Sequence, residues 1–126
     1  MPVTRTLLVA LGGLLGSVGR YWLAGAVQRL NGAEFPLGTL AVNVLGSFVV
    51  GLVMALSLER GALPANARIF LAVGVCGGFT TMSTFSYETI ALLRDGEVGL
   101  GLGNIGATLG SCLTGAWLGQ VVGRIL

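Results

Sequence analysis

The sequence predicts an all-α membrane protein with four transmembrane helices, and three observations lead to this fold class. Hydrophobic residues make up 54% of the 126 positions and charged residues only 10%, whereas typical soluble domains are about 25% charged. Four stretches reach the roughly 20 apolar residues that cross a bilayer. The connections between these stretches are short and hold most of the charged side chains.

The four predicted helices form one transmembrane domain that covers residues 1–126. The first and third contain one charged residue each, Arg20 and Glu88, while the second and fourth are uncharged. The last connection, with the sequence Arg-Asp-Gly-Glu, is typical of a tight interfacial turn. The predicted helices are 7–27, 36–58, 69–93 and 98–122, and the connections are 28–35, 59–68 and 94–97.

The first apolar stretch also has features of a cleaved signal peptide. Arg5 precedes the apolar run, and residues 24–26, Ala-Gly-Ala, are similar to a cleavage site. However, Arg20 lies between the run and that site, where a signal peptide is uncharged. We therefore interpret residues 7–27 as a transmembrane helix.

The arginines are divided almost evenly between the two ends of the predicted bundle. Arg29 and Arg94 lie at one end, with Arg20 in the helix nearer to it. Four others lie at the end that holds both termini, namely Arg5, Arg60, Arg68 and Arg124. The positive-inside rule therefore has little asymmetry to act on. We expect insertion in both orientations and an antiparallel, dual-topology homodimer, because one copy is too small to form a pathway.

Glycines recur at a spacing of four in the first and fourth helices. In a bilayer, small residues at this spacing allow helices to pack closely. The pattern leaves open whether the contacts lie within one subunit or between two copies. The glycines are Gly12 and Gly16 in the first helix, and Gly99, Gly103, Gly106, Gly110, Gly115, Gly119 and Gly123 in the fourth.

The middle of the third helix combines two adjacent glycines with several hydroxyl side chains. Residues 74–86 read GVCGGFTTMSTFS. This composition predicts a helix break at residues 77–81, which is tolerated only where protein or a watery cavity covers it. Carbonyls freed by such a break can coordinate a cation. In an antiparallel dimer, two breaks would cross near the membrane midplane.

Polar side chains within the helices indicate functional positions, because burying them in a bilayer is costly. Arg20 is expected either to reach the headgroups or to line a vestibule that attracts anions. Asn43 offers two N–H donors and one carbonyl, either to an ion or to a neighbouring helix. A polar stripe on the fourth helix either faces a pathway or bonds back to its own helix; it comprises Asn104, Thr108, Ser111 and Cys112.

Several classes of function lack the residues that they need. There is no histidine and no pair of embedded carboxylates, so an enzyme is poorly supported. The basic residues form no cluster, so nucleic acid is not an expected partner. Cys76 and Cys112 lack metal-ligand spacing, and free thiols are favoured over a disulfide or a metal site. An interfacial position accounts for Glu88.

Three sets of sequence blocks carry a resemblance to a known family: residues 12–13 (GG) with Gly16 and Arg20-Tyr21, residues 38–43 (GTLAVN) with 46–48 (GSF), and residues 77–81 (GGFTT) with 83–86 (STFS). With these blocks, the chain resembles the Fluc (CrcB) family of fluoride channels over nearly its full length. The resemblance implies passive fluoride export across the cell inner (plasma) membrane through two pores of an antiparallel homodimer. It also implies a structural sodium ion (Na+) at the dimer centre, held by the backbone carbonyls of Gly77 and Thr80.

The resemblance also assigns residues to the fluoride pathway. Asn43, Phe85 and polar groups of the fourth helix are expected to line each pore, and Arg20 to lie near its vestibule. Met82 departs from the family pattern, which has phenylalanine at this position, so that one aromatic ring edge is missing. The expected pathway residues are Arg20, Asn43, Met82, Ser83, Thr84, Phe85, Asn104, Thr108, Ser111 and Cys112.

Two other classes of function fit a four-helix membrane protein of this size. A small multidrug-resistance exporter is also a dual-topology dimer, but it exchanges protons through a glutamate in its first helix. Here the first helix carries Arg20, which repels cations. A structural helper subunit would leave the polar stripe and the predicted helix break unexplained. The fluoride channel is therefore the preferred hypothesis, with the lipid bilayer and a second copy as partners.

Overall fold

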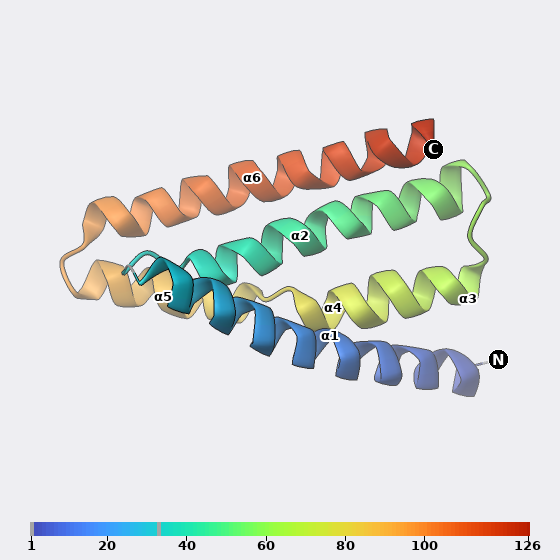
Figure 1. The fold of residues 1–126 in the computed structure, drawn as a ribbon, viewed down its shortest axis with the longest axis horizontal. Helices are drawn as coiled ribbons and strands as arrows, with labels where there is room; N and C mark the ends of the chain where they lie inside the picture. Colours follow the sequence, from blue (N-terminus) through green and yellow to red (C-terminus); the bar gives the residue numbers. More distant parts are fainter. Residues whose placement is uncertain (1, 33) are drawn as a thin grey trace.

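The computed structural model describes residues 2–32 and 34–126, which form long helices lying side by side (Figure 1). Four of its helical segments are long and apolar enough to cross a membrane, and the described residues contain no β-strand. The predicted all-α fold with four membrane-spanning helices is confirmed, and the chain is a multi-pass membrane protein. The elements are α1 (Pro2–Asn31), α2 (Leu37–Met54), the π-helical segment η1 (Ala55–Glu59), α3 (Ala65–Arg68), the π-helical segment η2 (Ile69–Cys76), α4 (Gly77–Phe79), α5 (Met82–Arg94) and α6 (Val98–Ile125).

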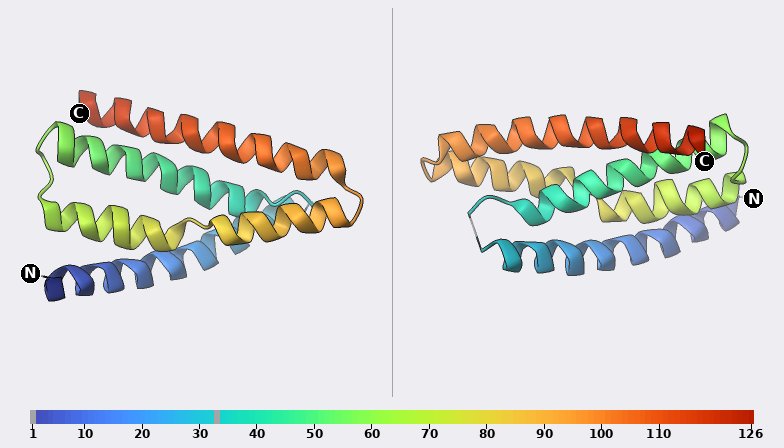
Figure 2. Two further views of the ribbon diagram at one scale, coloured as in Figure 1. Left: turned by 180° about the vertical axis from the view of Figure 1, so that it is seen from behind. Right: turned by 45° about the horizontal axis from the view of Figure 1, so that its top comes forward.

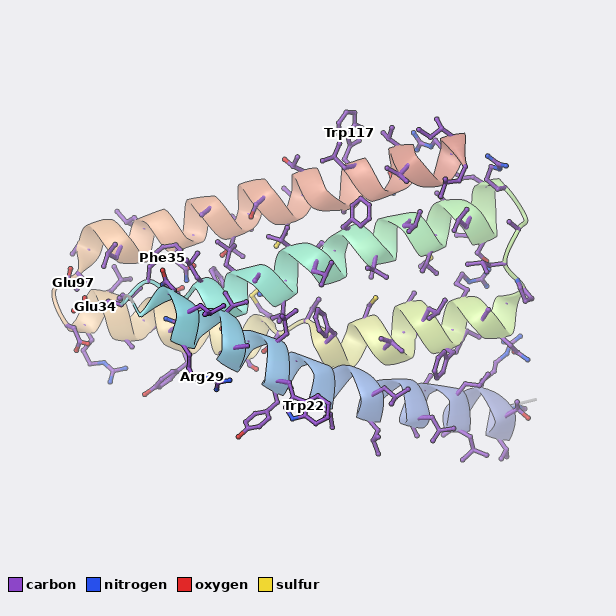
Figure 3. All side chains as sticks on the ribbon, in the orientation of Figure 1. Trp22, Arg29, Glu34, Phe35, Glu97 and Trp117 are labelled. Atoms are coloured by element: carbon purple, nitrogen blue, oxygen red, sulfur yellow. The ribbon has the colours of Figure 1, made fainter. Side chains whose placement is uncertain are left out.

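Both termini lie at the same end of the bundle as the connection between η1 and α3 (Figures 1 and 2). The turn between α5 and α6 lies at the opposite end, together with the start of α2. The arginines are therefore distributed along the bundle as the sequence predicted. Trp22 and Trp117 point away from the bundle (Figure 3) and are 69% and 59% exposed, as expected for side chains that face lipid.

Helix α2 is the centre of the packing. It runs along α6 and also contacts α1, η2 and α5. Val42 of α2 is fully buried, and Ala55 of the following η1 is 1% exposed. Gly51 brings α2 close to α6, because a Cβ there would overlap the carbonyl of Ala116. Small residues thus let the helix backbones approach closely, as membrane packing requires.

Helix α1 continues to Asn31, beyond the end predicted at residue 27. The side-chain amides of Gln28 and Asn31 both donate to the carbonyl of Phe35, at 3.1 and 3.4 Å. Gly32 then ends the helix with a φ of +61°, a conformation that glycine adopts without steric cost. Hydropathy marks where the apolar residues stop, whereas the capping glycine marks where the helix stops. Ala33, in the same predicted connection, lies outside the described residues.

The third membrane span begins at Ala65, inside the connection that the sequence predicted for residues 59–68. Pro64 precedes its first turn with extended backbone. Ser57 ties this turn to η1, because its hydroxyl donates to Leu63 O at 3.0 Å and accepts from the Arg68 guanidinium at 2.9 Å. The helix therefore starts several residues before its apolar part.

Two threonines in the third span, Thr80 and Thr81, have extended backbone, and we call them the extended pair. Gly77 and Gly78, at which the predicted break was to begin, are helical. The Thr80 hydroxyl donates to the carbonyl of Cys76 at 3.0 Å, and the Thr81 hydroxyl accepts the amide of Thr84 at 3.1 Å. The threonine side chains therefore end α4 and cap the start of α5, while Gly78 packs closely on α1.

Candidate functional site

A groove of about 360 Å3, which we call the central groove, lies beside the extended pair. Helices α2, α5 and α6 supply most of its lining, and the polar residues expected from the sequence are mixed with aliphatic ones. It brings together Asn43, Met82, Phe85, Thr108 and Cys112 of the expected fluoride pathway with Thr80 of the expected cation site. The remaining lining residues are Gly46, Ser47, Val50, Thr81, Leu109, Leu113 and Ala116.

Asn43 holds the extended pair through two hydrogen bonds. Its Oδ1 accepts the backbone N–H of Thr81 at 2.7 Å, and its Nδ2 donates to the carbonyl of Thr81 at 3.1 Å. The side chain is 8% exposed. An amide nitrogen carries two hydrogens, so one donor is used here and a second remains for the groove. For Asn43, the sequence left open a contact with an ion or with a neighbouring helix. The contact with a neighbouring span is present.

The carbonyls of Gly77 and Thr80 lack the amide partners that a continuous helix would give them. In such a helix they would accept from Thr81 and Thr84, four residues further on. Instead, the amide of Thr81 donates to Asn43, and the amide of Thr84 donates to the Thr81 hydroxyl. Backbone oxygens without their helical partners are suitable ligands for a hard cation.

Arg20 bonds to the protein backbone at a point close to the extended pair. Its Nε donates to the carbonyl of Gly78 at 3.0 Å, and the contact is partly buried. Arg20 also lines a second cavity of about 280 Å3, together with Thr84 and Glu88. Thr81 lines both this cavity and the central groove. Neither of the two roles expected for Arg20 included this bond to Gly78.

The polar stripe of α6 is largely engaged in hydrogen bonds within the subunit. Asn104 is 2% exposed and donates to the Thr89 hydroxyl of α5 at 2.9 Å. Thr108 donates to the Oδ1 of Asn104 at 3.3 Å, and Ser111 donates to the carbonyl of Ala107 in its own helix. Cys112 is a free thiol, half-buried in the central groove, and Cys76 is free and buried. Thr108 and Cys112 are the members of the stripe that line the groove.

Residues 7–120 match the family described as CrcB-like protein, Camphor Resistance (CrcB). The chain belongs to the CrcB family. A relative from Thermus thermophilus is 58% identical, over 94% of this chain and 100% of its own length. One from Geobacter sulfurreducens is 47% identical, over 98% and 100%, and one from Opitutus terrae is 49% identical, over 91% and 89%. Each of the three is named fluoride-specific ion channel FluC, and the resemblance noted in the sequence is confirmed.

Within this CrcB-family chain, the expected pathway residues fall into three groups. Half of them line the central groove, as described above. Arg20 and Thr84 line the second cavity instead. Ser83, Asn104 and Ser111 line neither of the two; the Ser83 hydroxyl lies 3.2 Å from that of Thr81, within hydrogen-bonding distance.

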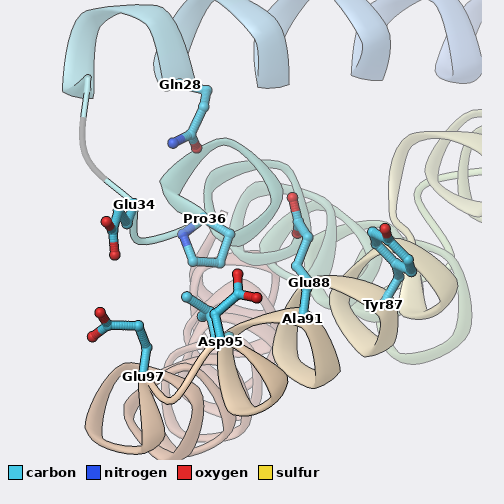
Figure 4. Close-up of a pocket in the computed structure, with 9 residues that line it drawn as sticks. Gln28, Glu34, Pro36, Tyr87, Glu88, Ala91, Asp95 and Glu97 are labelled. Carbon is cyan, nitrogen blue, oxygen red and sulfur yellow. The ribbon is translucent and has the colours of Figure 1, made fainter.

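Two residues that line these cavities, Thr81 and Glu88, were not among the pathway residues expected from the sequence. Thr81 is central to the site through its backbone, which no pattern of side chains indicates. Glu88 faces the second cavity and also an acidic cavity of about 620 Å3 that includes Glu34, Asp95 and Glu97 (Figure 4). The Oε1 of Glu88 is buried without a hydrogen-bond partner among the described residues. The sequence feature that could have indicated Glu88 is that it is the one acidic residue within the predicted helices.

Proposed function

We propose that this chain is a fluoride-selective ion channel that mediates passive fluoride export across the cell inner (plasma) membrane. The observation that carries the proposal is the central groove, which places an amide, a ring and polar side chains beside the extended pair. The names of the CrcB-family relatives support the same function. We further propose that the extended pair is a break inside the bilayer, with two pores in an antiparallel homodimer.

The chemistry of the groove suits a small anion. Moving such an ion into low dielectric costs on the order of 20 kcal/mol before compensation, so a pathway has to replace the hydration shell with donors. Asn43 has one Nδ2 hydrogen left for this purpose after its bond to Thr81. Phe85 lines the same groove and has a ring edge of positive character. Neither group carries a full charge that would trap the ion.

The open side of the groove supports a homodimer. Within the four helices the groove is a surface feature, so a second wall is needed to enclose an ion. Helix α6, which lines part of the groove, also presents Gly103, Gly106 and Gly110, and a Cβ on any of them would meet nothing within 4 Å. Such a glycine face permits a second helix to approach closely. The near-even division of arginines supports an antiparallel arrangement.

The backbone near the extended pair supports a structural sodium ion at the dimer centre. The carbonyls of Gly77 and Thr80 fit a hard cation, because their helical amide partners donate elsewhere. Gly77 is exposed, with nothing within 4 Å of a Cβ placed on it, so this side faces away from its own subunit. When bound, sodium would supply positive charge that links the two copies.

The purified protein in liposomes tests the function directly. Vesicles loaded with fluoride are expected to release it when a potassium ionophore removes the opposing voltage, while chloride-loaded vesicles do not. Proton-coupled exchange of a cationic drug would favour the exporter hypothesis instead. The absence of both activities, in protein shown to be folded, would favour a helper subunit.

The dual topology needs a separate test. A single cysteine placed in the turn at residues 94–97, in a chain lacking Cys76 and Cys112, is expected to react with an impermeant thiol reagent from both sides of the membrane. Labelling from one side alone would contradict dual insertion. Two lysines added to the turn are expected to bias insertion and to lower homodimer activity.

A further inference from the structure

We propose that Asn43 is a positioning residue for the cation site, in addition to its role as an ion-pathway donor. By accepting the amide of Thr81, it leaves the carbonyl of Gly77 available to sodium. A residue of the anion pathway therefore also sets the geometry of the cation site. This inference rests on the sodium site of the proposed function.

The hydrogen bonds of Asn43 hold the backbone of Thr81 from both sides. Its Oδ1 accepts from the amide of Thr81 at 2.7 Å, and its Nδ2 donates to the carbonyl of Thr81 at 3.1 Å. Asn43 is 8% exposed. Thr81 has a φ of −152° and a ψ of 115°, which is extended rather than helical. One side chain therefore replaces both helical hydrogen bonds that Thr81 would otherwise make.

Removing this side chain has a defined consequence for the backbone. An amide without a partner is costly in the membrane, so the N–H of Thr81 has to find another acceptor. The acceptor that helical geometry supplies is the carbonyl of Gly77, four residues earlier. Once that bond forms, Gly77 O points along the helix instead of toward an ion. The loss of Asn43 therefore weakens the cation site without any contact between Asn43 and the cation.

Arg20 acts on the neighbouring carbonyl group, that of Gly78. Its Nε donates to Gly78 O at 3.0 Å, next to Gly77 in the sequence. Gly78 packs on α1, where a Cβ would lie 2.6 Å from Gly13 O, whereas Gly77 has open space around it. The guanidinium satisfies the inward carbonyl and repels a cation from that side. Sodium is thereby directed to the outward carbonyl of Gly77.

Sodium-dependent thermal stability measures this role without relying on fluoride flux. The protein in detergent is heated at increasing sodium chloride, with N-methylglucamine chloride keeping the ionic strength constant. In the variant Asn43→Leu, the sodium concentration for half-maximal stabilisation is expected to rise by about tenfold or more, the range found when groups that orient metal ligands are removed. A purely structural role would lower the melting temperature at every sodium concentration and leave that midpoint unchanged.

A matched control lies on the same helix. Ser47 lines the central groove one turn from Asn43, and Ser47→Ala is expected to keep the wild-type sodium midpoint. Arg20→Met is expected to change the midpoint less than Asn43→Leu, because Arg20 bonds only the neighbouring carbonyl. If Asn43→Leu cannot be purified in a folded form, Asn43→Ser replaces it, since serine is smaller but too short to reach Thr81.

The outcomes separate this inference from the proposed function. If the wild-type protein shows no stabilisation by sodium, the sodium site itself is refuted and the inference falls with it. If the wild-type protein responds and the Asn43 variant has the same midpoint, the inference alone is overturned. A raised midpoint in the Asn43 variant with an unchanged midpoint in Ser47→Ala supports it.

Discussion

The two halves of α6 carry the same glycine spacing but use it differently. In the second half, Gly119 and Gly123 pack directly on α2, and a Cβ on Gly119 would overlap the carbonyl of Phe48. In the first half, Gly103 and Gly106 have nothing within 4 Å of a Cβ position. One half therefore packs within the subunit, while the other presents a bare glycine face.

The helical period explains the difference. The buried residues of α6 follow one continuous face at a spacing of three to four, and the glycines of the second half lie on that face. Gly103, Gly106 and Gly110 of the first half lie off it and have nothing within 4 Å of a Cβ position. The buried positions there are Gly101, Asn104 and Thr108. Equal spacing within a sequence thus does not imply the same partner. Whether a glycine of α6 packs on α2 depends on whether it lies on the buried face of the helix.

The largest effect is expected from Gly119→Leu. The added side chain meets the backbone of α2, with Leu52 N only 2.8 Å from the Cβ position, so the helices have to separate. A loss of at least about 3 kcal/mol in the free energy of unfolding is expected, at the upper end of overpacking effects. Thermal unfolding in detergent measures it. A wild-type melting temperature would mean that α2 and α6 pack less closely than described.

The same substitution in the first half, Gly106→Leu, separates the two uses of glycine. It has room within the subunit, and replacing a helical glycine favours the helix by up to about 1 kcal/mol. We expect folded protein with weakened dimerisation, measured by cross-linking yield and size-exclusion chromatography. If the dimer is unaffected, the first-half glycines face lipid instead of a second copy.

Asn104→Leu tests the polar part of the buried face. The substitution leaves the Thr89 and Thr108 hydroxyls without their bonds to Asn104, at 2.9 and 3.3 Å. We expect a loss of about 1–3 kcal/mol in the free energy of unfolding, and a smaller effect on fluoride flux per folded dimer. A large loss of flux with unchanged stability would instead support the pathway role predicted from the sequence.

The smallest effect is expected from Met82→Phe, in the central groove that the middle of α6 also lines. Met82 lines the central groove and is 66% exposed. Methionine fills space but lacks the positive ring edge of phenylalanine. If that edge contributes about 1 kcal/mol at the limiting step, flux rises several-fold in the variant. Equal initial rates at equal amounts of dimer would mean that position 82 only fills space.

Much of the site could be predicted, because membrane proteins keep few polar residues inside their helices. Asn43 and Thr108 are examples, and both line the central groove. Arg20 and Asn104 were equally visible in the sequence, but their partners were not. The bond from Arg20 to Gly78 spans 58 positions, and the bond from Asn104 to Thr89 depends on how α5 and α6 align.

The sequence by itself determined the four spans and the family, because hydropathy and local composition act over a single helix. Tertiary structure alone decided which glycines are covered and where the third span leaves the helix. The pair Gly77-Gly78 lowers helix propensity, but the extended backbone lies at Thr80 and Thr81. Asn43, from another helix, supplies the hydrogen bonds that hold it there. Local propensity permits such a departure, and a distant side chain fixes its position.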